Sequence, residues 1–569
     1  MDRTEIINSI KTHSPDVLIV GGGINGVGTF RDLALNGVNV LLVERSDFCS
    51  GASAASSHMA HGGIRYLENG EFRLVREAVK ERNRMIENAP HLVHPLPTAI
   101  PIFKLFSGLL NAPLKFLGWL DKPSERGALV IKIGLIFYDA FTHSQKTVPP
   151  HRFVGRKKAL NEFPGLNDEI RYVATYYDGS ILSPERLTLE LLLEGEAEGE
   201  HARALNYVSM QAVDGKIVNL KDEITGGIVE VTPQLIINAA GPWIDLTNQN
   251  LGLTTHYIGG TKGSHLVLNH DELHKAIGGH EIFFENKDGR IVLIFPLRDK
   301  VLIGTSDLPI DNPDDARCTQ DEVDYFLGML ERVFPNIKVD PSQIIFRFSG
   351  VRPLAHTQAK NAGQITRDHH IQEDNLGELP VYSLVGGKWT SYRAFSEQVA
   401  TRTLAFFGLQ RKAETTRLPI GGGKDYPVSQ ADIMKFLDGL ARSTGLPRKQ
   451  VETLFRRYGT RAILVGAFIK AGKDAPISAW PNFSYREILF LVQTEKIMHL
   501  DDLLLRRTLL AYLGELSLPL IEELANAIGA GLEWDESEIK AEVARSLSIL
   551  ADKHSVTFSL PGEYSQNTI

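Results

Sequence analysis

The chain has 569 residues, of which 43% are hydrophobic and 23% charged, an ordinary composition for a folded protein of roughly two or three domains. Its net charge is −8, from 61 basic and 69 acidic residues, so no overall positive field would attract nucleic acid. The two cysteines, Cys49 and Cys318, have neither disulfide-framework nor zinc-ligand spacing, so no metal site is predicted and a reducing compartment fits. Residues 1–15 do not resemble an export signal, and no apolar run reaches the roughly 18 residues of a spanning helix.

Residues 16–44 predict a strand, a glycine turn, a helix and a second strand. The run Val17 to Val20 is typical of a strand buried on both faces of a parallel sheet. Gly21-x-Gly23-x-x-Gly26 follows at once. These glycines would let the backbone approach a pyrophosphate at the N-terminus of the helix.

The second strand ends at Glu44, 18 residues after Gly26. A carboxylate here would accept hydrogen bonds from ribose hydroxyls and repel a 2′-phosphate, which disfavours NADP. A glycine turn in an unrelated α/β protein is the alternative reading of the three glycines alone. The flanking elements favour dinucleotide binding, and this stretch leaves FAD and NAD both open.

Residues 49–67 are rich in Ser, Ala and Gly and end in His61-Gly62-Gly63-Ile64-Arg65-Tyr66-Leu67. Small and hydroxyl residues let a backbone lie flat against a ligand and donate to phosphate. A Ser/Gly loop with an incidental His and Arg is the alternative. A charged helix is predicted next, over residues 71–88.

Residues 101–122 combine Phe, Leu and Trp with a narrow basic stripe that includes Lys104, Lys115 and Lys122. Lysines on one face and large apolar residues on the other are typical of a helix that lies in a bilayer interface. Pro113 must break or kink this helix. A buried helical hairpin or a subunit contact is the alternative.

The sequence Ser183-Pro184-Glu185-Arg186 predicts a helix start, with a hydroxyl N-cap and proline at the first helical position. A strand is predicted before it, over residues 171–178. Later strands lead into residues 238–243, Asn-Ala-Ala-Gly-Pro-Trp, where small residues again allow close approach of backbone to a ligand. Between residues 251 and 346, strands with few helices predict a separate antiparallel sheet, the lid or floor of a substrate pocket.

Residues 384–393 predict a strand, a glycine pair and the start of a helix that carries Lys388. Gly421 to Lys424 is a plausible linker. Helical patterns dominate after it, and the polar tail after Pro561 is predicted to be disordered.

Eight stretches together resemble FAD-dependent glycerol-3-phosphate dehydrogenases of the aerobic, membrane-associated type and their oxygen-using oxidase relatives. They occur in the family's order and cover the chain from about residue 16 to about residue 400. The stretches are residues 21–26, 61–68, 238–243, 262–265, 303–307, 349–354, 365–368 and 386–390. The helical C-terminal part is similar to the family's cap domain, less specifically.

The resemblance implies an α/β fold with a FAD-binding Rossmann-like domain, an antiparallel-sheet substrate domain and an all-helical C-terminal domain. We expect the FAD-binding domain to be discontinuous. The expected ranges are 1–100, 170–250 and 346–410 for the FAD-binding domain, 101–169 and 251–345 for the substrate and membrane-facing domain, 424–550 for the helical domain and 551–569 for the tail.

The resemblance also implies which residues line the site. Around the substrate it places Arg65, Tyr66, Arg352, Arg367 and Lys388, and several fixed cations suit a phosphate dianion because guanidinium forks match its oxygens. The cofactor-binding set comprises Gly21, Gly23, Gly26, Glu44, Arg45, Ser53, Ser57, His61, Gly62, Val208, Gly241, Trp243, Gly387, Lys388 and Thr390.

The implied reaction is oxidation of glycerol 3-phosphate to dihydroxyacetone phosphate, with hydride moving to flavin N5. The hydroxyl proton needs an acceptor, and His61 or His265 is the candidate because imidazole titrates near neutral pH. Gly387, Lys388 and the helix that starts near Thr390 would stabilise negative charge near flavin N1. For each histidine, a structural role is the alternative.

The implied partners are a quinone acceptor and a membrane surface. The protein would be cytoplasmic and peripherally attached to the inner face of the cell membrane, and a homodimer is one oligomeric state that the resemblance allows. The alternative within the family is an oxygen-using glycerol-3-phosphate oxidase.

The chain departs from the family where Ser57-His58-Met59-Ala60 replaces Ser-Lys-Leu-Ile. The missing positive charge leaves a related polyol phosphate, such as a tetritol phosphate, open as the substrate. An amine-oxidising relative would need a carboxylate pocket with one arginine, and three arginines with a lysine fit phosphate better. A non-catalytic dinucleotide-binding protein would not need these cations.

Overall fold

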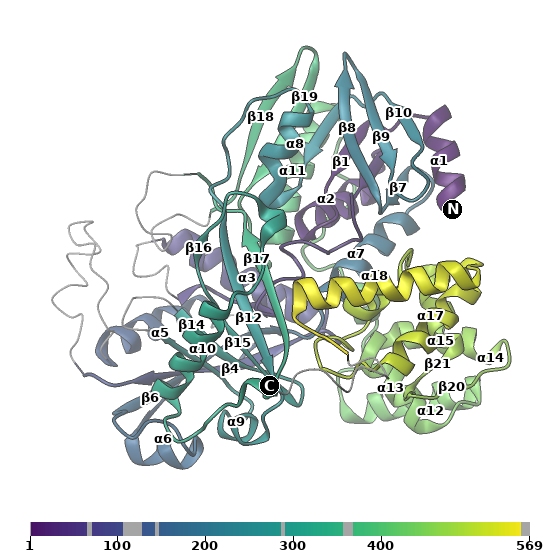
Figure 1. The fold of residues 1–569 in the computed structure, drawn as a ribbon. Helices are drawn as coiled ribbons and strands as arrows, with labels where there is room; N and C mark the ends of the chain where they lie inside the picture. The colour runs from purple at the N-terminus through teal and green to yellow at the C-terminus, as the bar shows by residue number, and fades with distance from the viewer. Residues whose placement is uncertain are drawn as a thin grey trace, which may run out of the picture. The chain divides into compact units, whose positions relative to one another are not determined.

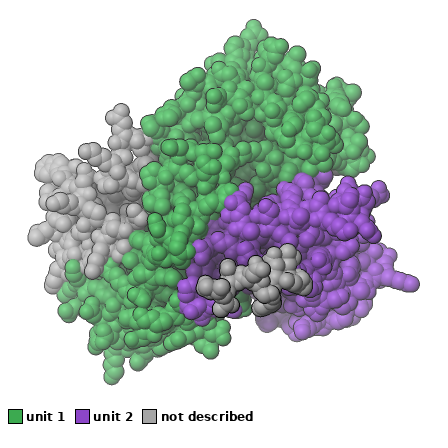
Figure 2. Space-filling view, viewed as in Figure 1, with its two compact units in different colours: residues 1–265, 270–339, 349–426 green, residues 266–269, 340–348, 427–569 purple. Residues whose placement is uncertain are grey.

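We analysed a computed structural model of the chain, which describes residues 2–64, 71–105, 128–142, 147–285, 291–356 and 368–558. Arg65, Tyr66 and Arg367, and residues 106–122 of the membrane helix predicted at residues 101–122, lie outside this set. The chain divides into two compact units, coloured separately in Figure 2. Unit 1 comprises residues 1–265, 270–339 and 349–426, and unit 2 comprises residues 266–269, 340–348 and 427–569.

The predicted dinucleotide-binding stretch forms the centre of a six-stranded sheet in unit 1 (Figure 1). The strand order is β18-β19-β11-β1-β2-β7, and β18 alone runs antiparallel to its neighbour. The strands are β1 Val17–Val20, β2 Val40–Val43, β7 Ala202–Leu205, β11 Leu235–Asn238, β18 His370–Leu376 and β19 Leu379–Val385. The predicted parallel strands are confirmed.

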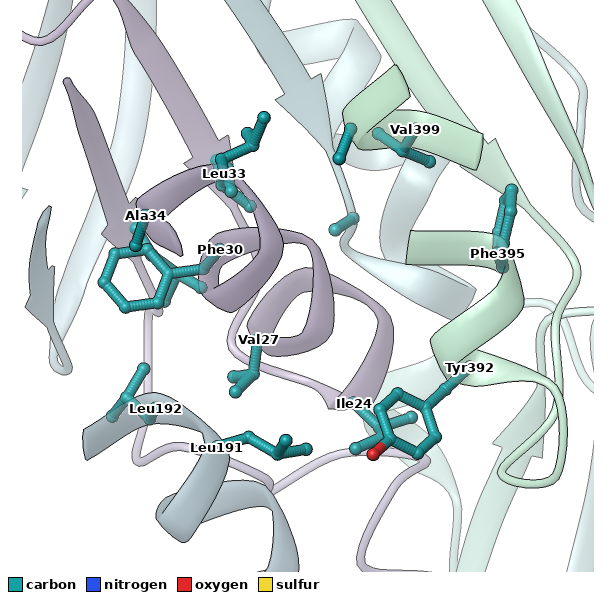
Figure 3. Close-up of a cluster of buried hydrophobic side chains, with 14 of the residues drawn as sticks. Ile24, Val27, Phe30, Leu33, Ala34, Leu191, Leu192, Tyr392, Phe395 and Val399 are labelled. Carbon is teal, nitrogen blue, oxygen red and sulfur yellow. The ribbon is translucent and has the colours of Figure 1, made fainter. Parts of the chain in front are cut away.

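Three helices, α2 (Ile24–Leu35), α7 (Pro184–Ala197) and α11 (Tyr392–Phe406), share one hydrophobic core with this sheet. Figure 3 shows α2 between the other two, with Leu191 and Leu192 on one side and Phe395 and Val399 on the other. The helix α7 begins as predicted, because the Ser183 hydroxyl accepts a hydrogen bond from the Arg186 N–H.

A second core joins this sheet to α1 (Arg3–Thr12) and to a three-stranded antiparallel sheet. The strands of that sheet are β8 Val208–Asp214, β9 Ile217–Asp222 and β10 Ile228–Val231. Val17 and Ile19 of β1 lie in the helix-side core, whereas Leu18 lies in this one, so β1 is buried on both faces. This two-sided burial explains its uninterrupted apolar sequence.

The second large sheet of the fold has ten strands in the order β16-β12-β15-β14-β13-β4-β6-β3, with β17 paired to β12 and β5 paired to β6. The predicted antiparallel pairing of strands within residues 251–346 is confirmed for β12 with β16, β13 with β14 and β14 with β15. The sheet is not separate, however, because β13 also pairs in parallel with β4. The strands are β3 Met59–Ala60, β4 Val93–Ile102, β5 Arg152–Gly155, β6 Tyr172–Ile181, β12 Thr261–Leu268, β13 Glu281–Glu285, β14 Ile291–Leu297, β15 Lys300–Gly304, β16 Leu308–Pro309 and β17 Ile344–Arg352.

Further helices in unit 1 connect or cover the strands. They are α3 Phe72–Asn88, α5 Ala128–Thr142, α6 Arg156–Glu162, α8 Ile244–Asn250, α9 Asp271–Ala276 and α10 Gln320–Val333. The linker predicted at residues 421–424 is wrong, because Gly421 to Gly423 form a 3-10 turn in which Gly422 and Gly423 are buried. Two carboxylates of α7 hold this turn: Glu194 accepts from the Gly421 N–H, and Glu190 accepts from the Gly422 N–H.

The C-terminal part of unit 2 is helical, as predicted, and also contains a short hairpin that was not predicted. Its elements are α12 Gln430–Thr444, α13 Arg448–Tyr458, α14 Ala462–Lys470, β20 Pro476–Ile477, β21 Trp480–Ser484, α15 Tyr485–Thr494, α16 Leu500–Asp502, α17 Leu518–Leu532 and α18 Glu536–His554. Within the described ranges, none of the helices has both the length and the apolar character needed to span a bilayer.

Candidate active site

The glycine turn after β1 is packed too tightly for any side chain at two of its glycines. A Cβ on Gly21 would lie 2.6 Å from the Ala239 carbonyl oxygen, and Gly21 has a φ of +115°. A Cβ on Gly26 would lie 2.0 Å from the Gly21 carbonyl oxygen. Gly23 is the N-cap of α2, so the turn delivers the N-terminus of that helix to the end of β1.

Glu44, at the end of β2, is bound by the turn itself. Its carboxylate accepts hydrogen bonds from the Gly22 N–H at 2.7 Å and the Ser46 N–H at 3.0 Å. Burial raises the pKa of Glu44, although these two backbone donors act in the opposite direction. The predicted ribose acceptor therefore also orders the glycine turn.

Arg45 and Trp243 form a small cluster with Asp314. The Arg45 guanidinium lies 4.8 Å from the centre of the Trp243 ring, and both side chains donate to Asp314 Oδ1, at 2.5 Å and 2.9 Å. Val208 donates its N–H to the Glu44 carbonyl at 2.8 Å, which places β8 beside the end of β2. Gly241 has a φ of +58° and open space where a Cβ would be.

The loop that carries Ser53 joins the glycine turn to the Gly386–Gly387 pair. The Ser53 hydroxyl accepts from the Ile24 N–H at 3.0 Å, and its carbonyl accepts from Trp389 Nε1 at 2.9 Å. Gly387 has a φ of +100°, and a Cβ there would lie 2.6 Å from Asn25 Nδ2. The two glycine motifs, more than 350 residues apart in sequence, therefore meet at the start of α2.

His265 and Ser57 form a direct contact between β12 and this loop. His265 Nε2 lies 2.8 Å from the Ser57 hydroxyl oxygen, and the imidazole packs on Gly304, where a Cβ would lie 2.2 Å from the ring. Burial, followed by the nearby charge of Arg352 and by His58, lowers the pKa of His265 to about 3. His265 is therefore a neutral imidazole near pH 7.

Arg352, at the end of β17, is held by three acceptors and a glycine. It donates to the Thr305 hydroxyl at 2.8 Å, the Ser306 carbonyl at 3.0 Å and Asp307 Oδ1 at 3.2 Å. A Cβ on Gly263 would lie 2.3 Å from its guanidinium, so only glycine leaves room for Arg352 in this position. Arg352 and His265 thus contact the adjacent residues Thr305 and Gly304, and His265 also contacts Ser57.

His61 and Gly62 are held mainly through their backbone. Thr390 donates its hydroxyl hydrogen to the His61 carbonyl at 3.0 Å, and the Gly62 N–H donates to Asp178 at 2.9 Å. Asp178 also accepts from the Tyr138 hydroxyl at 2.5 Å, and Arg82 donates to Tyr138 at 2.8 Å. A Cβ on Gly62 would lie 2.1 Å from the Tyr138 hydroxyl oxygen, which leaves no space for a larger residue.

Asp178, Tyr138 and Arg82 hold the backbone of Gly62 through this chain of hydrogen bonds, and the sequence alone did not predict them. All three are buried, on β6, α5 and α3 respectively. Burial raises the pKa of Tyr138 well above its usual value, so the phenol stays protonated and donates. The three residues lie in separate stretches of the sequence, and none belongs to a local motif that would predict their contact.

A second missed group surrounds Glu322. Its carboxylate accepts from Lys262 at 2.8 Å, Ser264 at 2.8 Å and Ser306 at 2.5 Å. Burial acts to raise the pKa of Glu322, but these hydrogen bonds lower it overall. Because Glu322 neutralises Lys262, that lysine is a structural cation and orders the strand that carries His265.

The residues present fit a flavin dinucleotide. The glycine turn, the N-terminus of α2 and Glu44 form the cradle that a pyrophosphate and a ribose require. Asn25 Oδ1 is buried beside the Gly386–Gly387 pair and accepts no hydrogen bond from any described residue, so it is an acceptor that a bound ligand would satisfy. Ser57 lies further along the loop that carries Ser53. His265 and Arg352 lie on β12 and β17, which pair in the ten-stranded sheet.

Comparison with known proteins supports this arrangement. A family model described as FAD dependent oxidoreductase matches residues 16–391, and one described as the C-terminal domain of alpha-glycerophosphate oxidase matches residues 413–539. A glycerol-3-phosphate dehydrogenase from Synechocystis sp. is 34% identical over 530 residues, which are 88% of this chain and 90% of that protein. A D-erythritol 1-phosphate dehydrogenase from Brucella abortus is 30% identical over 502 residues, 87% of this chain and 94% of that protein.

A solved structure has the same fold. It is a glycerol-3-phosphate dehydrogenase from Bacillus halodurans complexed with FAD, with a TM-score of 0.74, 24% identity and coverage of 97% of each chain. The family models and the relatives confirm the predicted fold class, FAD as the cofactor and an oxidoreductase activity. The chain therefore belongs to the family of FAD-dependent glycerol-3-phosphate dehydrogenases.

Proposed function

We propose that this protein oxidises sn-glycerol 3-phosphate to dihydroxyacetone phosphate with FAD and passes the electrons to a quinone at a membrane surface. The observation that carries the proposal is the cluster of Ser57, His265 and Arg352, in which a neutral imidazole lies beside a guanidinium. Guanidinium suits the phosphate end of the substrate, and imidazole suits the proton of its secondary hydroxyl. FAD, when bound, supplies the acceptor for the carbinol hydride.

In this proposal the residues of the chain act at two ends of the substrate. Arg352 binds phosphate oxygens, together with Lys388 and with the predicted Arg65, Tyr66 and Arg367. His265 is one candidate for the acceptor of the hydroxyl proton, and its contact with Ser57 orients the imidazole. Its pKa, lowered to about 3, makes it a weak base near pH 7. His61 remains the second candidate for the base.

Anaerobic reduction of the flavin tests the proposal. Glycerol 3-phosphate added to the purified yellow holoenzyme without oxygen should bleach the flavin absorbance. A flavin that stays oxidised with glycerol 3-phosphate and with every other polyol phosphate would contradict the proposed activity.

A tetritol phosphate is the second candidate substrate. The relative from Brucella abortus is named D-erythritol 1-phosphate dehydrogenase. The residue at position 58 is a second reason to retain a tetritol phosphate as a candidate substrate. His58 is fully buried, and burial lowers its pKa to about 4, so the position that carries a cation in the resembling family is neutral here. Comparing kcat/KM for glycerol 3-phosphate and erythritol phosphates distinguishes the two substrates.

The membrane surface is supported by helix α5. Its side chains Leu129, Ile133, Ile136 and Phe137 are 40%, 48%, 52% and 49% exposed, while Ile131, Leu135 and Tyr138 pack into a core. Lys132 is exposed on the same helix. An exposed apolar helix face with a lysine beside it suits the interface of a bilayer with anionic lipids. The membrane helix predicted at residues 101–122 comes shortly before α5 in the sequence.

The quinone acceptor follows from this location, because a quinone is dissolved in the bilayer. We propose a peripheral position on the cytoplasmic face of the cell membrane, and a homodimer remains an open prediction. Rapid turnover with oxygen and none with a quinone analogue would instead favour the oxidase alternative.

A further inference from the structure

Arg45 and Trp243 follow the carboxyl ends of two parallel strands, β2 and β11. Strand β1 lies between these two strands in the sheet and pairs with both. Neighbouring strands are about 4.8 Å apart, so β2 and β11 are separated by about 10 Å. The contact between the Arg45 guanidinium and the Trp243 ring therefore joins the two sides of β1, next to the strand end where the glycine turn begins.

The Trp243 ring also packs on the loop that borders the glycine turn. A Cβ on Gly51 would lie 3.0 Å from Trp243 Cζ3. The Cys49 N–H of the same loop donates to the Gly22 carbonyl at 3.0 Å, and the Ser53 hydroxyl accepts from the first N–H of α2 at 3.0 Å. Trp243 thus lies against the loop that forms one wall of the pyrophosphate cradle.

Asp314 holds the arginine and the tryptophan together. Its Oδ1 accepts from Arg45 at 2.5 Å and from Trp243 Nε1 at 2.9 Å, and its Oδ2 lies 3.4 Å from the second Arg45 nitrogen. Asp314 belongs to the 3-10 turn Pro313–Asp315, which lies outside the six-stranded sheet. One carboxylate oxygen therefore receives a hydrogen bond from each side of β1.

The backbone of Asp314 is tied in turn to β12. Arg317 donates to the Asp314 carbonyl at 3.0 Å, and the Lys262 ammonium donates to the Arg317 carbonyl at 2.7 Å. Lys262 is buried on β12 and also donates to Glu322 at 2.8 Å. The turn that carries Asp314 is thus held by the strand that carries His265.

The contact between Arg45 and Asp314 is well exposed. The two side chains are 48% and 49% exposed. An ion pair in this environment contributes little to the stability of a fold, because water and salt screen it. It can therefore open and close without unfolding of the chain, and its effect is expected on a ligand in the cradle rather than on the fold.

The position of Arg45 in the chain indicates which half of the dinucleotide this ligand presents. Glu44, the residue before it, is the expected acceptor for ribose hydroxyls, and that ribose belongs to the adenosine half of FAD. The expected flavin end lies at the Gly386–Gly387 pair, on the other side of the glycine turn. A guanidinium at the adenosine end suits stacking on adenine or binding of a phosphate oxygen.

We propose that Asp314 is a positioning residue that holds Arg45 and Trp243 together as a strap across the adenosine half of bound FAD. The strap consists of these three side chains, and it must open before FAD can leave. The inference concerns the retention of FAD and does not depend on the identity of the substrate. The alternative is a surface ion pair that has no effect on FAD.

The rate of FAD release from the holoenzyme separates the two roles, and the rise in flavin fluorescence after dilution measures it. Asp314→Ala should release FAD about tenfold faster, because it removes the ion pair and leaves the cation–π contact without a common acceptor. Asp314→Asn keeps an acceptor for the Trp243 N–H and should give an intermediate rate. Asp315→Ala, at an exposed acid in the same turn, is the matched control and should release FAD at the wild-type rate.

Competition by ADP shows which half of FAD the strap covers. ADP contains the adenosine half and lacks the flavin, so it should compete with FAD for the wild-type apoprotein. Its dissociation constant should rise in Asp314→Ala by the same factor as that of FAD. The unfolding temperature of the apoprotein should be the same in the wild type and in Asp314→Ala, because an exposed ion pair contributes little to the fold.

Release of FAD from Asp314→Ala at the wild-type rate, or ADP that does not compete with FAD, overturns the inference. A lower unfolding temperature of the Asp314→Ala apoprotein, or equally fast release from Asp315→Ala, would show a structural role instead. If Asp314→Ala is isolated without FAD, release from Asp314→Asn is measured, and the wild-type rate there overturns the inference. All of these measurements are made without substrate, so a flavin that glycerol 3-phosphate does not bleach contradicts only the proposed function.

Discussion

Arg352 illustrates how a single residue is prepared for an anionic ligand. Its guanidinium already donates to Thr305, Ser306 and Asp307, so its orientation is set before a substrate arrives. Only one of these acceptors, Asp307, is charged, at 3.2 Å. A phosphate dianion would offer stronger charge-assisted hydrogen bonds than the two neutral oxygens.

Arg352→Ala should raise KM for the phosphorylated substrate by about 10- to 150-fold, because each charge-assisted hydrogen bond contributes about 1.5–3 kcal/mol. Flavin content should change little, since the hydrogen bonds of Arg352 are to the segment that follows β15. Steady-state kinetics and the ratio of absorbance at the flavin and protein maxima give the two quantities. Equal losses of substrate affinity and flavin would show that Arg352 is structural.

Among single residues, the sequence predicted correctly those that belong to a local motif. Gly21, Gly26 and Glu44 have the contacts expected of a dinucleotide turn, because strand, turn and helix are adjacent in sequence. Asp178 and Tyr138 could not be found, because their role comes from contacts with residues 40 or more positions away. Arg65, Tyr66 and Arg367 stay predictions, since they lie outside the described residues.

Helix α5 is the element that joins the proposed membrane face to the flavin loop. Its exposed side carries Ile133 and Ile136, and its buried side carries Tyr138, which contacts Gly62 and Asp178. The sequence of α5 is apolar on nearly all sides, so the local pattern does not show which face is buried. Packing against β6 and α3 decides it.

Tyr138→Phe should destabilise the protein by about 1–3 kcal/mol, because Asp178 and Arg82 each lose a buried hydrogen-bond partner. FAD affinity should also weaken, since Asp178 orients the Gly62 N–H. Thermal unfolding and a titration of the apoprotein with FAD measure the two effects, and Tyr325→Phe on α10 is a control. A variant with wild-type stability and FAD affinity would show that this hydrogen bond is dispensable.

Among the elements, the sequence predicted the parallel strands and α7 well, because their signals are local. It did not predict that β4 and β6 join the sheet of β12 to β16, nor that β13 pairs in parallel with β4. Strand pairing across long separations depends on packing, which a local alternation of polar and apolar residues does not encode.

On the scale of the whole molecule, attachment to a membrane depends on few residues. Ile133→Glu combined with Ile136→Glu should reduce co-sedimentation with vesicles of anionic and zwitterionic lipid, because each change puts a charge on the exposed apolar face of α5. Leu464→Glu, at a residue 56% exposed on α14, is the matched control. Undiminished sedimentation of the double variant would count against α5 as a docking element.

Three histidines that are buried in their neutral form should make the protein less stable in mild acid, whereas buried Glu281, whose pKa is raised to about 8, acts in the opposite direction. Burial lowers the pKa of His58 to about 4, of His265 to about 3 and of His369 to about 4, against an ordinary value of 6.5. Between these values each of these histidines binds more protons in the unfolded chain than in the folded one, so their contribution to stability is complete above pH 6.5 and decreases as pH falls toward 4.

Thermal unfolding of the holoenzyme at about pH 8, about pH 6 and about pH 5 checks this dependence. The carboxylates with lowered pKa values, such as Asp222 and Glu322, lose their contribution only at lower pH, so the two windows are separable. The same measurement on Glu281→Gln removes the opposing contribution of Glu281, and equal unfolding temperatures of that variant at all three pH values would contradict the neutral state of the histidines.

The single oxygen Oδ1 of Asp178 accepts hydrogen bonds from Gly62 and from Tyr138, which lie 116 and 40 residues away in sequence. Such distant partners meet late during folding, after the intervening chain has collapsed. The loop of Gly62 therefore acquires its final shape only once β6 and α5 have assembled. We therefore expect FAD to be captured at this end of its site by a chain that is already largely folded.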